Sequence, residues 1–207
     1  MKRLYSILCQ ILSFICLICC VLFLSQSANA ANEYDANSIK RMEDLINKTY
    51  CGYITVLDTD TIDMINSPLS IKDQVIFGVF FLYNNYVSYN TLHETDHGHR
   101  AIIPIKSVQR VLKNVLGSYL SEQTIKNIST DRFDIVGDTI LLGGSDLGAI
   151  EPIEIKKIIR DDKGLVHIRA ISELFDGSIE HFKIILKEIV DMDTMSWNVL
   201  LLKSLDR

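Results

Sequence analysis

The sequence predicts an α+β protein in which N-terminal helices pack on a C-terminal curved antiparallel β-sheet. In the first half, apolar residues recur at three- and four-residue steps, which is the period of a helix. In the last third, short alternating runs are separated by turns that contain Asp and Gly, which is typical of antiparallel hairpins. The 207 residues are 48% hydrophobic, which is enough for one domain with a substantial core.

The first thirty residues have the three parts of a secretory signal peptide. Lys2 and Arg3 form the positive start, an apolar stretch runs from Ile7 to Leu24, and Ala28-Asn29-Ala30 is an A-x-A cleavage site. The alternative is an uncleaved anchor, because the apolar stretch approaches the roughly 20 residues that span a bilayer. The cleavage site favours removal, so we expect a periplasmic or secreted protein that has no membrane contact after cleavage.

Three segments follow from this interpretation: a signal peptide at 1–30, a loose polar leader at 31–38 and a single α+β domain at 39–207. Four of the five cysteines lie inside the signal, so Cys51 alone remains and the domain has no internal disulfide. Cys51 falls in a helical pattern and is interpreted as a small core residue rather than a reactive thiol.

The first helix is predicted from Ile39 to Leu57, with Ser38 as its N-cap. A turn-rich break follows at 58–68. The next segment, 71–87, is the most apolar of the mature chain. One set of its apolar residues fits a helix and another fits a strand; we favour the helix, and expect core in either case.

Further along, 93–100 is predicted to be a polar loop and 101–103 a short strand. Helical spacing returns from Ile105 to Leu116, and Gly117 stands where a helix C-cap belongs. A short helix is predicted to begin at Ser121.

The last third is predicted to form strands joined in sequence order. Two short strands flank the Gly137-Asp138 turn. An antiparallel meander then follows, with Trp197 as a core aromatic in its last strand. Its predicted strands are 153–160, 165–174, 179–190 and 197–205.

The segment His93-Glu94-Thr95-Asp96-His97-Gly98-His99 contains H-E-x-x-H, the pattern of zincin-type peptidases. On a helix, His93 and His97 would bind zinc and Glu94 would serve as general base. The surrounding sequence favours a loop, and no third ligand is evident. A noncatalytic metal site of His93, His97 and His99 is the alternative, because imidazole suits zinc, copper and nickel. A solvated polar loop without metal is the interpretation that we favour.

Two other patterns are weaker. His167 and His181 lie on neighbouring predicted strands, but the turn between them does not place them opposite each other, so no shared site is expected. The Gly-rich run at 143–148 has no lysine and is not followed by a helix, as a phosphate-binding loop would be. We predict a flexible turn there.

The order of elements resembles the NTF2-like and cystatin-like group of small α+β domains. The resemblance rests on the first helix at 39–57, the helix at 105–116 and the meander from Ile153 to Leu205, and it is architectural, without a diagnostic motif. It implies a conical cavity between sheet and helices as the default pocket. It implies no activity, because such folds host enzymes, ligand-binding proteins and interaction modules.

The formal net charge of −5 argues against binding to nucleic acid or to anionic membranes, and no run of basic residues interrupts the sequence. We expect an exported noncatalytic domain that binds a small ligand or a cell-envelope protein. The alternatives are a metal-dependent hydrolase that uses His93, Glu94 and His97, and a structural or assembly factor of the cell envelope.

Overall fold

The computed structural model describes residues 34–54, 61–86, 93–95, 98–143, 151–191 and 194–206. The predicted signal peptide at 1–30 lies outside these residues. The helices are α2 (Ala36–Ile54), α3 (Ile71–Tyr86), α4 (Ile105–Val111), the π-helix η3 (Leu112–Leu116) and α5 (Glu122–Lys126). The strands are β1 (Thr61–Asp63), β2 (His93–Thr95), β3 (Gly98–Pro104), β4 (Asp134–Val136), β5 (Thr139–Gly143), β6 (Ile153–Arg160), β7 (Leu165–Glu173), β8 (Ile179–Asp191) and β9 (Thr194–Ser204).

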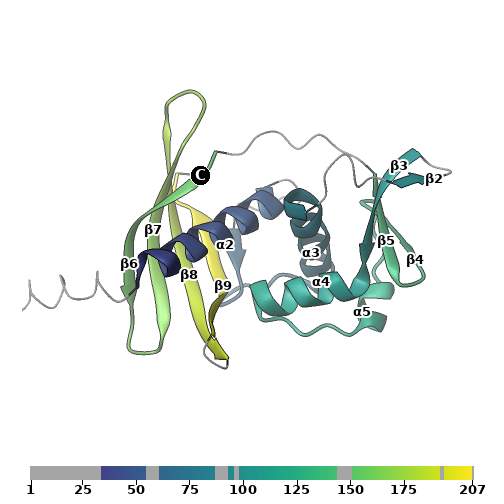
Figure 1. Ribbon diagram of the computed structural model, residues 1–207, viewed down its shortest axis with the longest axis horizontal. Coiled ribbons are helices and arrows are strands. Elements are labelled where there is room, and N and C mark those ends of the chain that lie inside the picture. The colour runs from purple at the N-terminus through teal and green to yellow at the C-terminus, as the bar shows by residue number, and fades with distance from the viewer. Residues whose placement is uncertain are drawn as a thin grey trace, which may run out of the picture.

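These elements form two antiparallel sheets with helices between them. The larger sheet has the strand order β1-β9-β8-β7-β6 and the smaller has the order β2-β3-β5-β4. In Figure 1 the larger sheet lies at one end of the molecule and the smaller sheet at the other, with α3 and α4 between them, while α2 crosses the larger sheet and ends beside α3. The predicted class, N-terminal helices packed on a C-terminal curved antiparallel sheet, is confirmed.

The meander from β6 to β9 forms where the sequence places it. Gly164 and Gly177 adopt φ angles of 74° and 78° in the turns on either side of β7, a conformation that side chains disfavour. Residues of β7 alternate between buried and more exposed positions, so one face of the sheet packs inward. Register shifts place one extra residue in β6 and one in β9, which marks bulges that bend these strands and increase their twist.

Strand β1 was missed by the sequence analysis, which assigned its residues to a turn-rich break. Thr61, Ile62 and Asp63 pair antiparallel with the end of β9 and form one edge of the larger sheet. Only Ile62 of the three is fully buried. A strand with one buried residue has too little alternation to be detected, and its pairing partner lies far away in the sequence.

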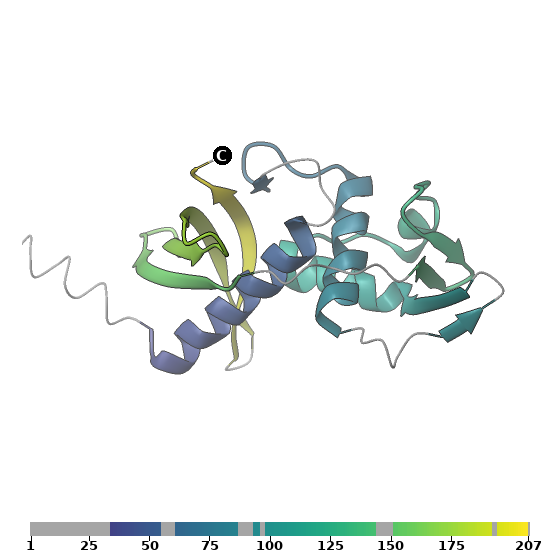
Figure 2. The same ribbon diagram turned by 90° about the horizontal axis from the view of Figure 1, so that it is seen from above.

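Helix α2 lies across the larger sheet (Figure 2) and begins earlier than predicted. Its first residue is Ala36, so the predicted leader at 31–38 overlaps the helix. Ser38 is not the N-cap: its backbone N–H donates to Asp35 Oδ1 at 2.7 Å. Aspartate serves this role as well as serine does, because its carboxylate accepts from an otherwise unpaired N–H of the first turn.

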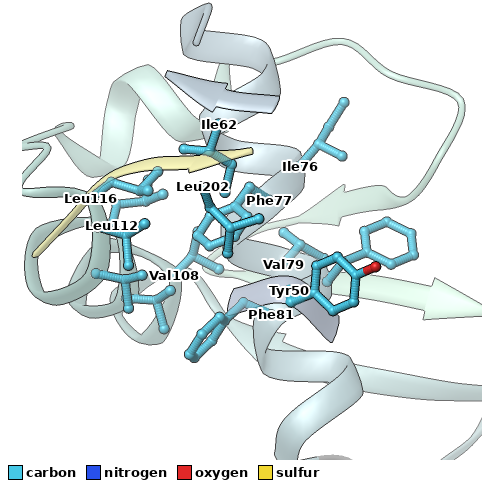
Figure 3. Close-up of a cluster of buried hydrophobic side chains, with 14 of the residues drawn as sticks. Tyr50, Ile62, Ile76, Phe77, Val79, Phe81, Val108, Leu112, Leu116 and Leu202 are labelled. Carbon is cyan, nitrogen blue, oxygen red and sulfur yellow. The ribbon is translucent and has the colours of Figure 1, made fainter. Parts of the chain in front are cut away.

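The core extends from the larger sheet through α3 to α4. Helix α3 confirms the helical alternative for 71–87, and its buried residues lie all around the helix, which explains why its pattern also suited a strand. Figure 3 shows Phe77 of α3 beside Leu202 of β9, with Val108 and Leu112 nearby. The core thus joins both halves of the sequence.

A glycine brings α3 and α4 close together. A Cβ atom on Gly78 would lie 3.0 Å from Val108 Cγ1 and 3.1 Å from Leu112 Cδ2. These distances are tighter than ordinary packing contacts, so the absence of a side chain sets the separation of the two helices.

Candidate functional site

A cavity of about 510 Å³ opens between α2 and the α4–η3 segment, above the end of α3 and the start of β9. We call it the α2–α4 pocket. Figure 1 and Figure 2 show α3 near the centre of the molecule, with the end of α2 and the α4–η3 segment next to it. The lining comprises Arg41, Asp44, Leu45, Lys48, Phe81, Leu82, Tyr86, Ser107, Arg110, Val111, Asn114, Val115, Ser196 and Trp197. The pocket therefore combines an apolar wall with three cationic side chains.

Helix α2 supplies one wall through residues that lie three to four positions apart. Arg41, Leu45 and Lys48 share one helix face because of this spacing. The Lys48 Nζ lies 2.8 Å from Asp44 Oδ2 and 5.5 Å from the centroid of the Tyr86 ring on α3. The hydrogen bond to Asp44 raises the pKa of Lys48, so the amine stays charged at neutral pH.

Helix α4 and η3 supply the opposite wall. Ser107, Arg110, Val111 and Asn114 recur at three- and four-residue steps and face the cavity. The end of η3 is fixed to β9 by the side chain of Asn198. Its Nδ2 donates to Lys113 O at 3.1 Å and to Asn114 O at 2.8 Å. These carbonyls belong to the last turn, where helix carbonyls run out of regular partners. Lys113 O also accepts from Gly117 N at 3.1 Å, so Asn198 is its second donor.

Trp197 of β9 connects the two walls. Its side chain is 3% exposed, as predicted for a core aromatic, yet it also contributes to the pocket lining. The guanidinium carbon of Arg41 lies 5.5 Å from the centroid of the indole ring, within the range of a cation–π interaction. Arg41 also donates from Nη2 to Met195 O at 2.5 Å. Arg41 is therefore held in place before any ligand arrives.

A second cavity, of about 610 Å³, lies beside β6 and has a different lining. Glu43, Glu151, Glu154 and Glu173 all contribute to it, and no lysine or arginine does. Asn47 closes one side, where its Oδ1 accepts from Ile153 N at 2.6 Å. Although larger, this cavity has few apolar side chains and no aromatic one. The α2–α4 pocket suits an organic ligand better, because such sites are mostly apolar with a few polar groups.

The backbone of the histidine-rich segment differs from the predicted polar loop. Strands β2 and β3 form an antiparallel hairpin, in which His93 pairs with Arg100 and Glu94 pairs with His99. The zincin motif needs a helix to place its two histidines on one face, and the described part of this segment is strand. His97 lies outside the described residues. The metal site of His93, His97 and His99 and the catalytic role of Glu94 stay predictions.

Among the described residues, no three or more His, Cys, Asp or Glu side chains are grouped so that they could hold a metal ion. His167 and His181 are separate, as expected: His167 pairs in register with Ile185, and His181 with Ile171. Each histidine instead has its own carboxylate. His167 Nε2 lies 2.9 Å from Asp161 Oδ2, and His181 Nδ1 lies 3.0 Å from Asp206 Oδ2.

Two further sequence predictions concern Cys51 and the Gly-rich run at 143–148. Cys51 is half-buried, and this burial raises the pKa of its thiol, which keeps it protonated and poorly nucleophilic. Most of the Gly-rich run at 143–148 lies outside the described residues.

Comparisons of the chain with protein-family models, curated proteins and solved structures found no match. Among the described helices, none combines the length and apolar character needed to cross a bilayer. The function is therefore inferred from the geometry of the pocket.

The sequence analysis did not identify the α2–α4 pocket, although two signals were present. Cationic and apolar residues alternate along one face of α2, at 41, 45 and 48. A similar mixed face recurs on the α4–η3 segment, where polar residues at 107, 110 and 114 accompany the apolar Val111. Each pattern is also typical of a solvent-exposed helix edge, and only the fold shows that both faces border one cavity with Trp197.

Proposed function

We propose that this protein is an exported, noncatalytic domain that binds a small ligand in the α2–α4 pocket. The observation that carries the proposal is a cavity of about 510 Å³ whose lining combines apolar and aromatic side chains with a few polar groups. This volume lies within the range of small-molecule sites. Export is inferred from the charged start, apolar stretch and A-x-A site of residues 1–30.

The polar groups around the pocket support binding rather than catalysis. Arg41 and Arg110 supply positive charge and several N–H donors each, which suits them to holding a ligand. Ser107, Asn114 and Ser196 supply hydroxyl and amide groups, which orient a ligand through hydrogen bonds. The walls are held by contacts that need no ligand, including the Asn198 hydrogen bonds to η3. Such a preformed site loses little entropy on binding.

The architecture is also compatible with the NTF2-like and cystatin-like resemblance noted from the sequence. In that resemblance, a pocket between sheet and helices is the default site, and the α2–α4 pocket lies between helices and the first residues of β9. Family membership remains part of the proposal.

The test uses the only tryptophan of the chain as a reporter. Phenylbutanol, a neutral compound with a flexible apolar body, is titrated while Trp197 fluorescence is recorded. We expect a saturable change in emission and a higher melting temperature in the presence of the compound, because a ligand that binds the folded state stabilises it.

A matched pair of variants locates the binding. Ser107→Phe places a ring in the pocket, whereas Ser129→Phe adds the same ring at an exposed position outside it. We expect Ser107→Phe to abolish the fluorescence change and Ser129→Phe to retain it. Equal binding by both variants, or no saturable binding by the unmodified protein, would contradict the proposal.

A further inference from the structure

The charges around the α2–α4 pocket differ in sign from those of the whole chain. The chain carries a formal net charge of −5, yet Arg41, Lys48 and Arg110 border the pocket against a single carboxylate, Asp44. Asp44 is already paired with Lys48 at 2.8 Å. The two arginines thus remain without a carboxylate from the lining, and the field at the pocket mouth favours an anion.

The guanidinium of Arg41 is held in one orientation and keeps N–H donors that can bind an anion. A guanidinium has five N–H donors, and the hydrogen bond to Met195 O at 2.5 Å uses one nitrogen. Stacking over Trp197 fixes the plane of the group, which reduces the entropy lost when a ligand binds. The remaining donors match the two oxygens of a carboxylate.

Arg110 lies on the opposite wall and forms no ion pair with the described residues. Its side chain is exposed at the pocket border. An anion in the pocket would therefore meet one guanidinium that is fixed and one that is free to close on it.

The same geometry disfavours a cationic ligand. Aromatic rings bind cations through their faces, and tryptophan binds them best. Besides Phe81, the pocket lining contains two aromatic rings, Trp197 and Tyr86. Each ring already has a cation of the protein 5.5 Å from its centroid, Arg41 over Trp197 and Lys48 over Tyr86. At either of these rings a ligand ammonium would have to displace the resident cation, and anywhere in the pocket it would be repelled by the cationic lining.

The apolar lining requires more than a small inorganic anion. Phe81, Val111 and Val115 are buried side chains that border the cavity, and the half-buried Leu45 and Leu82 extend this surface. Covering such a surface gains roughly 25 cal/mol per Å² of apolar area removed from water. A ligand that uses the whole pocket therefore has an apolar body as well as a charged group.

We infer that the α2–α4 pocket binds an amphiphilic organic anion. Its anionic group pairs with Arg41 and Arg110, and its apolar body lies against Phe81, Val111 and Trp197. This inference rests on the proposed function, because it names the ligand class for the same pocket.

The experiment compares three probes that share one phenylbutyl body and differ only in the charge of the terminal group. They are phenylbutyrate, phenylbutanol and phenylbutylamine, and their dissociation constants are measured by Trp197 fluorescence and by calorimetry at low ionic strength. We expect phenylbutyrate to bind about tenfold more tightly than phenylbutanol, because hydrogen bonds to charged groups exceed neutral ones. We expect phenylbutylamine to bind most weakly.

Variants assign the preference to the two arginines. Arg41→Gln and Arg110→Gln should each reduce the preference for phenylbutyrate over phenylbutanol several-fold, and the double variant should abolish it. Binding of phenylbutanol should persist, which shows that the pocket is intact. Arg169→Gln removes the same charge from an exposed position on β7, outside the pocket, and should leave the preference unchanged.

The outcomes separate the two proposals. Equal affinity for all three probes, or tightest binding of phenylbutylamine, would overturn the anion inference and leave the pocket as a binding site. An equal loss of preference in Arg169→Gln and Arg110→Gln would also overturn it, because a general charge effect would then explain the data. Absence of binding by all three probes would contradict both proposals.

Discussion

Cationic side chains gather in two regions of this molecule, and their surroundings differ. Around the α2–α4 pocket, Arg41 and Lys48 each stack over an aromatic ring and hold a hydrogen-bond partner. On the outer face of the larger sheet, Lys157, Arg169, Lys183 and Lys203 are aligned in direct register across β6, β7, β8 and β9. We call these four residues the cation row. All four are exposed, and none forms an ion pair with the described residues.

The contacts around a cationic side chain therefore decide whether it can contribute to a binding site. Like charges directly opposite each other on neighbouring strands destabilise a sheet. The cation row therefore costs stability. In the pocket, by contrast, Arg41 and Lys48 are fixed by contacts with the protein, and the cations border an apolar cavity. Of the two regions, only the α2–α4 pocket has the features of a small-molecule site.

The strongest test of how the pocket is built concerns Asn198, which joins β9 to the end of η3. Asn198→Asp replaces a donor to two carbonyls with a carboxylate that repels them. We expect a loss of about 3 kcal/mol in the free energy of unfolding, since each lost hydrogen bond costs about 0.5–1.5 kcal/mol and a carboxylate at the buried position 198 adds a desolvation cost. Denaturant unfolding measures this value.

The matched control for Asn198 is Asn37→Asp, the same substitution at an exposed position near the start of α2. A carboxylate is favourable there, so stability should be unchanged or slightly higher. Equal stability of Asn198→Asp and the unmodified protein would show that the pocket walls are not fixed by this contact.

Gly78 sets the separation of α3 from α4, and hence of Phe81 from Val111 in the pocket. Gly78→Val should lower the free energy of unfolding by about 2 kcal/mol, because the added methyl groups would overlap Val108 and Leu112. Phenylbutanol affinity should change as well, because the helices move apart. Gly143→Val, on a strand with open space around its Cα, should be close to neutral. Similar losses in both variants would contradict this account.

Removing one positive charge from the cation row is expected to raise the free energy of unfolding. Lys183 lies between Arg169 and Lys203, so Lys183→Glu replaces two repulsive neighbours with two attractive ones. We expect the free energy of unfolding to rise by about 0.5–1 kcal/mol, and the gain to shrink at high salt. Lys187→Glu on the same strand faces Leu165 and Asn198 and should give a smaller change. A loss of stability in Lys183→Glu would show that the row is not under repulsion.

The smallest expected effect concerns Asp35, at the start of the helix that carries Arg41. The hydrogen bond from Ser38 N lowers the pKa of Asp35 below its ordinary value of 3.8. A lowered folded-state pKa stabilises the protein above the unfolded-state pKa, and this stability is lost as the pH falls through the folded-state value. Asp35→Asn keeps an N-capping group but cannot ionise.

The unmodified protein should therefore exceed Asp35→Asn slightly in stability near neutral pH, and the difference should vanish in acid below the lowered pKa. Denaturant unfolding at both pH values provides the measurement. A difference that grows as the pH falls would contradict the assigned hydrogen bond.

Much of the fold was predictable because local patterns and packing agree. The Asp-Gly turn before β8 and the alternation along β7 indicate a hairpin without reference to other segments. Gly117 adopts the left-handed conformation expected of a C-cap, with φ of 67°. The elements that were missed, β1 and β2, are three-residue strands, too short for periodicity to show.

Neither cation region was predictable, because both depend on long-range register or packing. The residues of the cation row lie at least twelve positions apart in the sequence, and only the pairing of four strands aligns them. The sequence analysis therefore found no basic cluster, although the fold assembles one. The pocket likewise combines residues of α2 with Arg110 and Trp197, whose proximity no local pattern encodes.

One measurement tests the central claim, that the pocket arginines bind ligand and the cation row does not. Phenylbutyrate is titrated against two double variants that lose the same charge, Arg41→Gln/Arg110→Gln and Arg169→Gln/Lys183→Gln, with Trp197 fluorescence as the signal. The account predicts at least a tenfold weaker affinity in the first variant and an unchanged affinity in the second. An equal loss in both, or a larger loss in the second, would contradict it.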